Sequence, residues 1–230
     1  MLQCLRNNAR PDCSYAINAC ARHCIEPKEP HGAAVKRIVR HLKGALDEGL
    51  IIRPDMHNLT LDCHVDADFA GLWGHESDQD PVCVKSRTGF VITLEGCPVT
   101  WVSKLQTEIA LSMLEAEYIA LSTAMQDLVP MRRLLMEIGE KCNLDFVKPA
   151  MVHSTIFEDN NGALGLAKSP KMTPRTKHIG VKYHWFRSLI GEEHGFVIEK
   201  VESKEQKADI FTKGLSTEAF EHVRHILMGW

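Results

Sequence analysis

Four acidic residues stand where a carboxylate is costly unless something compensates its charge. Asp66 lies in HVDADFAG, at the end of a run whose alternate residues are apolar. Glu117 shares the apolar stripe of a predicted helix. Asp159 follows an apolar strand, and Asp209 lies inside a short predicted helix. A bound metal ion or a paired cation would compensate charges in such places.

Each acid also has a simpler explanation when it is taken alone. The alternation around Asp66 suits a strand with one solvated face, Asp159 suits a helix N-cap, and Asp209 suits a solvated helix. One joint explanation is also available. Two divalent cations about 4 Å apart can promote phosphodiester hydrolysis when carboxylates converge on them from several elements. Because Mg²⁺ prefers oxygen ligands, the four acids predict a magnesium site with Asp68 as a neighbour.

The elements that would position these acids form a predicted mixed sheet covered by helices, an α/β fold. A long helix begins after Ser112, which forms an S-x-x-E capping box with Glu115. Pro130 should kink or split that helix. Another helix is expected around 176–190. The predicted strands are 61–67, 89–94, 99–102, 151–157 and 195–201.

The chain up to about Pro54 is predicted to be helical. In HGAAVKRIVRHLKG, apolar residues form one stripe and basic residues fill the remainder, namely Lys36, Arg37, Arg40, His41 and Lys43. Two interpretations stay open. The basic side is either an ordinary solvated helix face or a surface that lies along phosphates.

Composition sets the broad class. The 230 residues are 44% hydrophobic and 25% charged, which is typical of a globular protein. The formal net charge of -3 gives no overall attraction to nucleic acid, so any such surface must be local. No apolar run of about eighteen residues predicts a membrane span. The eight cysteines have irregular spacing, typical of reduced intracellular thiols rather than a zinc site.

Several long segments, in order, resemble the RNase H region of copia-type (Pseudoviridae) retrotransposon Pol polyproteins. The N-terminal ARPDCSYAINACARH and AAVKRIVRHLKGALDEGL resemble the end of the reverse transcriptase of the same polyprotein. The resemblance therefore implies two units: residues 1–55, a helical thumb or connection remnant, and residues 56–230, an RNase H-like domain. The matching segments of the second unit are DADFAG, SRTGFVITLEGCPVTWVSKLQ, ALSMLEAEYIAL, EDNNGAL, RTKHIGVKYHWFR and KADIFTKGL.

The resemblance implies an RNase H-like fold, with a mixed five-stranded sheet flanked by helices, that cuts the RNA strand of RNA–DNA hybrids. It implies two Mg²⁺ ions, with Mn²⁺ as a substitute, held by the catalytic residues Asp66, Glu117, Asp159 and Asp209. Expected partners are the hybrid and the remainder of the Pol polyprotein, in a cytoplasmic virus-like particle or the nucleus. No Y-x-D-D motif is present, so we expect no polymerase activity. The alternative is a noncatalytic nucleic-acid-binding remnant of a decayed or repurposed element.

A hybrid presents phosphates on both strands, so cations are expected beside the acids. For the RTKHI stretch, a solvated basic helix start is the simpler interpretation, and His178 is alternatively a packed residue. The candidate nucleic-acid-binding residues are Lys85, Arg87, Lys104, Arg175, Lys177, His178 and Lys182.

Overall fold

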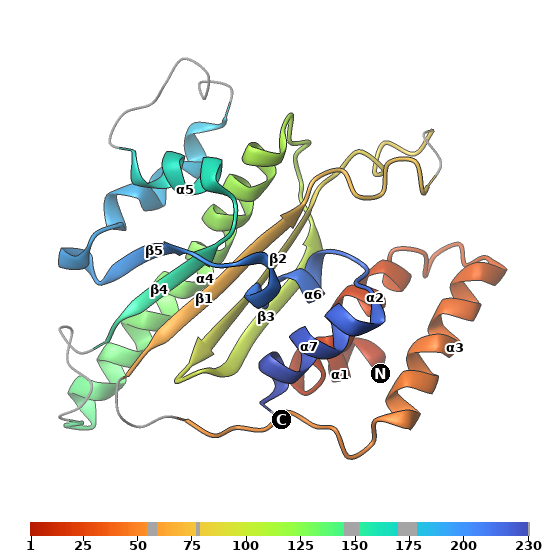
Figure 1. Cartoon of the computed structure of the whole chain (residues 1–230), viewed down its shortest axis with the longest axis horizontal. Helices are drawn as coiled ribbons and strands as arrows, with labels where there is room; N and C mark the ends of the chain where they lie inside the picture. Colours follow the sequence, from red (N-terminus) through yellow and green to blue (C-terminus); the bar gives the residue numbers. More distant parts are fainter. Residues whose placement is uncertain (55–58, 77–78, 145–151, 170–178, 230) are drawn as a thin grey trace.

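A computed structural model describes residues 1–54, 59–76, 79–144, 152–169 and 179–229. Its centre is a five-stranded sheet with the order β3-β2-β1-β4-β5 (Figure 1). The first three strands pair antiparallel, whereas β4 and β5 run parallel to β1. This confirms the expected mixed, helix-flanked sheet of an RNase H-like fold. The strands are β1 (Leu61–Asp68), β2 (Arg87–Leu94), β3 (Cys97–Leu105), β4 (Ser154–Glu158) and β5 (Phe196–Lys200).

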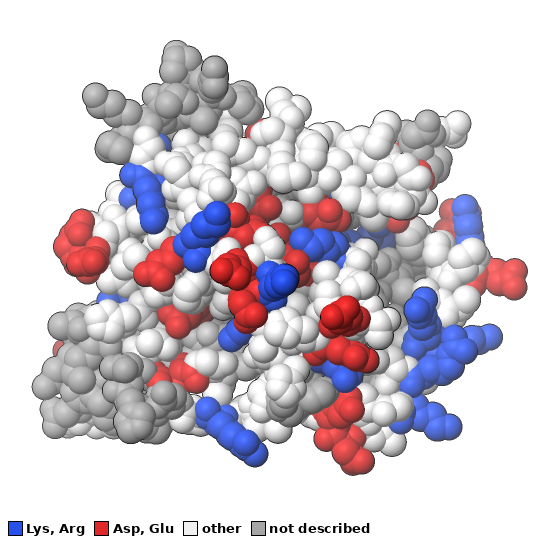
Figure 2. Space-filling view, in the orientation of Figure 1, with Lys and Arg blue, Asp and Glu red and all other residues white. Residues whose placement is uncertain are grey.

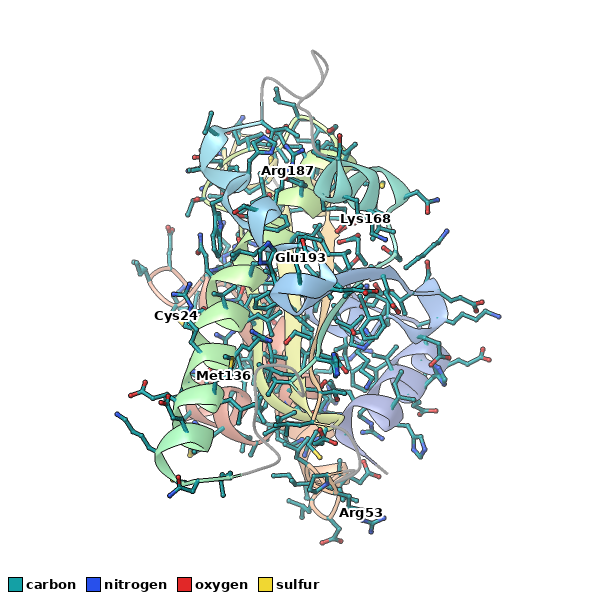
Figure 3. The ribbon with its side chains drawn as sticks, turned by 90° about the vertical axis from the view of Figure 1, so that its left-hand side faces the viewer. Cys24, Arg53, Met136, Lys168, Arg187 and Glu193 are labelled. Carbon is teal, nitrogen blue, oxygen red and sulfur yellow. The ribbon has the colours of Figure 1, made fainter. Side chains whose placement is uncertain are left out.

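Helices cover both faces of this sheet. In the edge-on view of Figure 3, the long helix that carries Met136 lies on one side and the C-terminal helices lie on the other. No helix in the described ranges combines the length and apolar character needed to cross a bilayer. The helices are α1 (Leu2–Asn8), α2 (Ser14–Ala21), α3 (Glu29–Gly44), α4 (Met113–Lys141), α5 (Asn161–Lys168), α6 (Asp209–Thr212) and α7 (Thr217–Met228).

The alternation predicted for β1 is confirmed, because the two faces of this strand meet different surroundings. Cys63 and Val65 are fully buried in the main core, which also contains the inward side of α4. His64 and Asp66 face the opposite layer, where they contact Gln206 and Thr212. The polar face of β1 is therefore buried as well, beneath the segment that leads into α6.

The helix α4 starts as predicted. The Ser112 Oγ accepts a hydrogen bond from the Glu115 backbone amide at 3.2 Å, and Glu115 Oε2 accepts one from the Leu111 amide at 2.8 Å. The helix then continues unbroken through Pro130, so the expected split does not occur. Pro130 itself is exposed. The neighbouring Leu128 and Val129 are buried, and packing of α4 on the sheet holds the helix together.

The single helix predicted around 176–190 is wrong over its described part, and 176–178 lie outside the described residues. Two short 3₁₀ segments, η3 (Val181–Tyr183) and η4 (Trp185–Leu189), replace it. Tyr183 and Phe186 are both buried in the main core. Their spacing of three residues suits the 3₁₀ repeat, which places i and i+3 on the same side.

The N-terminal helices pack directly on the sheet domain. Helix α2 contacts β3 and α6, and the short η1 (Pro11–Cys13) contacts α6 and α7. The Trp101 Nε1 donates a hydrogen bond to the Arg6 carbonyl at 2.6 Å. The segment that resembles a reverse-transcriptase remnant therefore shares an interface with the domain that contains the acidic residues.

Candidate active site

The site forms where β1 and β4 separate. These strands pair only at Cys63–Ile156 and His64–Phe157. Beyond this point the buried Gln206 amide lies between them, and its Nε2 donates to the Val65 carbonyl at 2.8 Å. The point where parallel strands part at their carboxyl ends is the usual location of a binding site in α/β sheets.

Three of the predicted acids meet at this opening. Ligand oxygens of Asp66, Glu117 and Asp159 all lie within 4.8 Å of one another. They come from three separate elements, namely β1, α4 and the end of β4. Asp66 is 2% exposed and Glu117 is 4% exposed. The arrangement can place several oxygens around one small cation.

Asp159 is not the N-cap of α5, which was its simpler explanation. The neighbouring Asn160 is the cap, and its Oδ1 accepts hydrogen bonds from the amides of Gly162 and Ala163 at 2.8 and 3.1 Å. The Asp159 carboxylate instead joins the acidic group and accepts a hydrogen bond from Ser203 Oγ at 2.9 Å.

The fourth predicted acid, Asp209, lies beside this group and is linked to it by a lysine. The Lys213 Nζ lies 2.9 Å from Asp209 Oδ1 and 3.7 Å from Asp66 Oδ2. Thr212, on the same short helix, donates a hydrogen bond to Asp66 Oδ2. Sequence reasoning missed Lys213, although its i,i+4 spacing from Asp209 was a usable signal.

Gly89 allows α6 to approach the sheet closely enough for these contacts. Gly89 pairs with Asp66 in the sheet. A Cβ at this position would lie 2.5 Å from Thr212 Cγ2 and 2.8 Å from Phe211 Cβ. Any larger residue would therefore push α6, and Asp209 with it, away from Asp66.

Burial and crowding raise the pKa of Asp66, Glu117 and Asp209, because both disfavour the charged form. Burial, followed by the charges of Glu158, Asp66 and Asp159, raises the pKa of Glu117 to about 11. Burial and the Asp66 charge raise the pKa of Asp209 to about 7, against the opposing effect of Lys213. Carboxyls with perturbed pKa values that lie close together are characteristic of functional sites.

A fifth carboxylate, Glu158, was not predicted. It is 0% exposed at the end of β4, and its Oε1 accepts a hydrogen bond from the Asn160 amide at 3.0 Å. Burial raises its pKa, and the charges of Asp159 and Asp66 add to that effect. The segment IFED resembles the end of a strand followed by surface acids. The only signal in the sequence for an inward Glu158 was the alternation of inward and outward side chains along β4.

The donor set suits a hard divalent cation. All of the gathered side-chain ligands are carboxylate oxygens, which Mg²⁺ and Mn²⁺ prefer. Within the part of the chain that the structure describes, Glu117 Oε2 and Glu158 Oε2 are buried and accept no hydrogen bond. Buried oxygens in this situation need a partner, and a metal ion would supply one. Asp68, the next residue on this face of β1, also has a raised pKa through burial and the Asp66 charge.

The described candidates for nucleic-acid binding, Lys85, Arg87, Lys104 and Lys182, are not all exposed. Arg87 is 2% exposed, because its guanidinium donates to Asn18 Oδ1 at 2.5 Å and lies 5.1 Å from the centre of the Tyr15 ring. It is therefore occupied by contacts with α2 rather than presented to a phosphate. Lys85 is half-buried in the loop before β2. Arg175, Lys177 and His178 lie outside the described residues.

Lys104 and Lys182 do come together. They line one cleft of about 290 Å³ between β3, α4 and η3, with hydroxyl and amide side chains such as those of Thr88 and Gln126 around it. Lys104 is exposed, whereas Lys182 forms an ion pair with Glu108. This cleft is the place where two of the predicted cations share a surface.

The fold and the group of acids are those of the RNase H-like class, and comparisons with known proteins identify the family of the chain. No protein-family model matches the chain. It is 33% identical over 218 residues to the retrovirus-related Pol polyprotein from transposon TNT 1-94 of Nicotiana tabacum, covering 95% of this chain and 15% of that protein. It is 32% identical over 213 residues to the corresponding polyprotein from transposon RE1 of Arabidopsis thaliana, covering 93% of this chain and 13% of that protein.

The chain therefore belongs to the copia-type retrotransposon Pol family. It spans less than one sixth of the length of these two curated relatives. Among solved structures it is similar to LC11-RNase H1 from compost, with a TM-score of 0.43 and 17% identity over 72% of this chain and 97% of that one.

Proposed function

We propose that this chain is the ribonuclease H of a copia-type element and hydrolyses the RNA strand of RNA–DNA hybrids. The observation that carries the proposal is the convergence of Asp66, Glu117 and Asp159 within 4.8 Å, from three elements of an RNase H-like fold. Family membership supports it, because the curated relatives are Pol polyproteins. Cleavage would leave a 3′-hydroxyl and a 5′-phosphate.

The four acids would hold two Mg²⁺ ions, for which Mn²⁺ can substitute. When bound, such ions activate the attacking water and stabilise the leaving oxygen of a phosphodiester. The residues of the chain fix the ligand positions. Thr212 and Ser203 hold Asp66 and Asp159 by hydrogen bonds, and the packing of α4 on β1 holds Glu117. Expected partners are the hybrid and the remainder of the Pol polyprotein.

The test is cleavage of an end-labelled hybrid with Mg²⁺ by the wild type and by Asp159→Asn. The variant keeps the size of the side chain but removes an anionic ligand. Substitution of a residue that only supports a metal ligand typically lowers activity roughly 10- to 100-fold. We expect Asp159→Asn to lower the cleavage rate by more than this. Asp127→Asn is the matched control, because Asp127 is exposed on α4 and its substitution should leave turnover unchanged.

Two outcomes would contradict the assignment. Unchanged turnover in Asp159→Asn would remove that residue from the catalytic set. Uncut RNA with retained hybrid binding by the wild type would favour a noncatalytic nucleic-acid-binding remnant instead.

A further inference from the structure

Helix α3 carries a group of exposed cations. Within α3 the one acidic residue is Glu29, at its first position. The basic residues Lys36, Arg37, Arg40 and Lys43 are all exposed, and none forms an ion pair or hydrogen bond with another described side chain. In a chain of net charge -3, this is a concentrated local positive surface.

The spacing of these residues makes one continuous face. Lys36, Arg40 and Lys43 recur at i, i+4 and i+7, so they form a stripe along about 10 Å of helix. The opposite side of α3 is anchored, because Ile38 packs with Cys13 and Ile17. The cations therefore lie on the exposed side of a helix whose other side packs against the rest of the protein.

The position of α3 relative to the acidic site is fixed by a buried ionic network. Asp12 pairs with Arg10 at 2.7 Å and with His41 Nε2 at 3.0 Å, and its side chain is 0% exposed. Arg10 also donates to the Ala45 carbonyl, just beyond α3, at 3.1 Å. Asp12 belongs to η1, which contacts α6, the helix that begins with Asp209. Packed elements therefore connect the basic face to the acidic site.

Both features lie on the same side of the molecule. Figure 2 shows basic side chains gathered over α3, and acidic side chains interspersed with basic ones near the centre of the same face, around the end of β1 and α6. A duplex that lies over the acids needs cations beside it, since phosphates dominate nucleic-acid affinity. Beside the acids, Lys213 is paired with Asp209 and Asp66, and Arg87, which begins the neighbouring strand β2, is buried.

We propose that the exposed face of α3, formed by Lys36, Arg37, Arg40 and Lys43, binds the phosphate backbone of the duplex whose RNA strand lies at the acidic site. The identity of that duplex as an RNA–DNA hybrid rests on the proposed function. The contact is electrostatic and independent of sequence, so it contributes affinity and orientation rather than base recognition.

The test compares Arg40→Gln/Lys43→Gln with Arg133→Gln/Lys141→Gln. Both double variants replace one exposed arginine and one exposed lysine on a helix, and the control pair lies near the far end of α4. Binding of a labelled hybrid of about 24 base pairs is measured in EDTA between about 50 and 200 mM salt, so that no cleavage occurs. Glutamine is a good helix former, and an unchanged unfolding midpoint checks the fold.

We expect the α3 variant to bind at least about tenfold more weakly near 0.1 M salt, with a log–log salt slope smaller by about 2. The control variant should match the wild type. Equal slopes in all three proteins, or no hybrid binding by the wild type, would overturn the proposal. So would an α3 variant that binds hybrid normally but loses affinity for the remainder of the polyprotein, because α3 would then be a protein-binding surface.

The nuclease proposal fails separately. A wild type that binds hybrid through α3 in EDTA but leaves the RNA uncut with Mg²⁺ would refute hydrolysis and leave the α3 surface established.

Discussion

Lys213 occupies part of the space that a metal ion would need, and this gives a quantitative prediction. Its ammonium group lies 2.9 Å from Asp209 Oδ1 and 3.7 Å from Asp66 Oδ2. A divalent cation that binds these oxygens must displace the ammonium group and is also repelled by it. We therefore expect Lys213→Met to bind Mn²⁺ more tightly than the wild type.

The magnitude follows from the shorter contact. Two unit charges at 2.9 Å attract each other by about 1.4 kcal/mol in water and by about 6 kcal/mol at an effective dielectric constant of about 20. The Lys213 side chain is 41% exposed, so solvent screens the pair and the value in water is the appropriate one. A difference of about 1.4 kcal/mol corresponds to roughly tenfold tighter Mn²⁺ binding.

Isothermal titration with Mn²⁺ at constant pH measures this difference. Lys141→Met is a matched control, because Lys141 also pairs with a carboxylate four residues earlier, Glu137, at 2.5 Å. That pair is about 30–36 Å along α4 from Glu117, so the control should leave Mn²⁺ affinity unchanged. The reasoning is refuted if Lys213→Met binds Mn²⁺ equally or more weakly, which would mean that the lysine organises the ligands instead of competing with the metal.

Two further predictions concern stability. Burial alone would raise the pKa of Asp12, but hydrogen bonds from Arg10 and His41 lower it from 3.8 to about 2. Asp12 therefore stabilises the fold above about pH 4, and about 2 kcal/mol of the free energy of unfolding is lost as the pH falls from 4 through 2. Urea unfolding at several pH values should show this loss, and Asp12→Asn should make the free energy of unfolding less dependent on pH in this range. Gly89→Ala should lower the free energy of unfolding by about 1–3 kcal/mol through overpacking and weaken Mn²⁺ binding. Gly165→Ala, whose Cβ would meet nothing within 4 Å, should be neutral or stabilising, and equal behaviour of the two alanine variants would contradict the argument.

The strands were predictable because each carries its own period-two pattern. The prediction of 89–94 falls within the observed Arg87–Leu94, and 61–67 differs by one residue from Leu61–Asp68. The segment around 176–190 failed for a physical reason. Its periodic apolar residues resemble a helix, but Tyr183 and Phe186 are buried by two short 3₁₀ segments, and local pattern cannot distinguish these from one helix.

The convergence of Asp66, Glu117 and Asp159 was predictable because burial of acids on apolar patterns demands a compensating charge. The surroundings of the site were harder to predict from the sequence, since they depend on contacts between segments that are distant in the chain. Arg87 appeared to be a surface cation, yet Asn18 and Tyr15 enclose it from 69 or more residues earlier in the chain. The catalytic and nucleic-acid-binding roles of the individual residues stay predictions until the variants are measured.

The position of Asp209 depends on tertiary contacts more than that of the other predicted acids. Helix α6 has four residues, far fewer than the roughly 12–15 that an isolated helix needs to be stable. Its position must therefore come from contacts: the absence of a side chain at Gly89, the hydrogen bond from Ser103 Oγ to the Phe211 carbonyl at 2.6 Å, and packing of α2 against α6. Because α2 lies in the segment that resembles reverse transcriptase and contacts α6, the geometry of the acidic site is coupled to that segment.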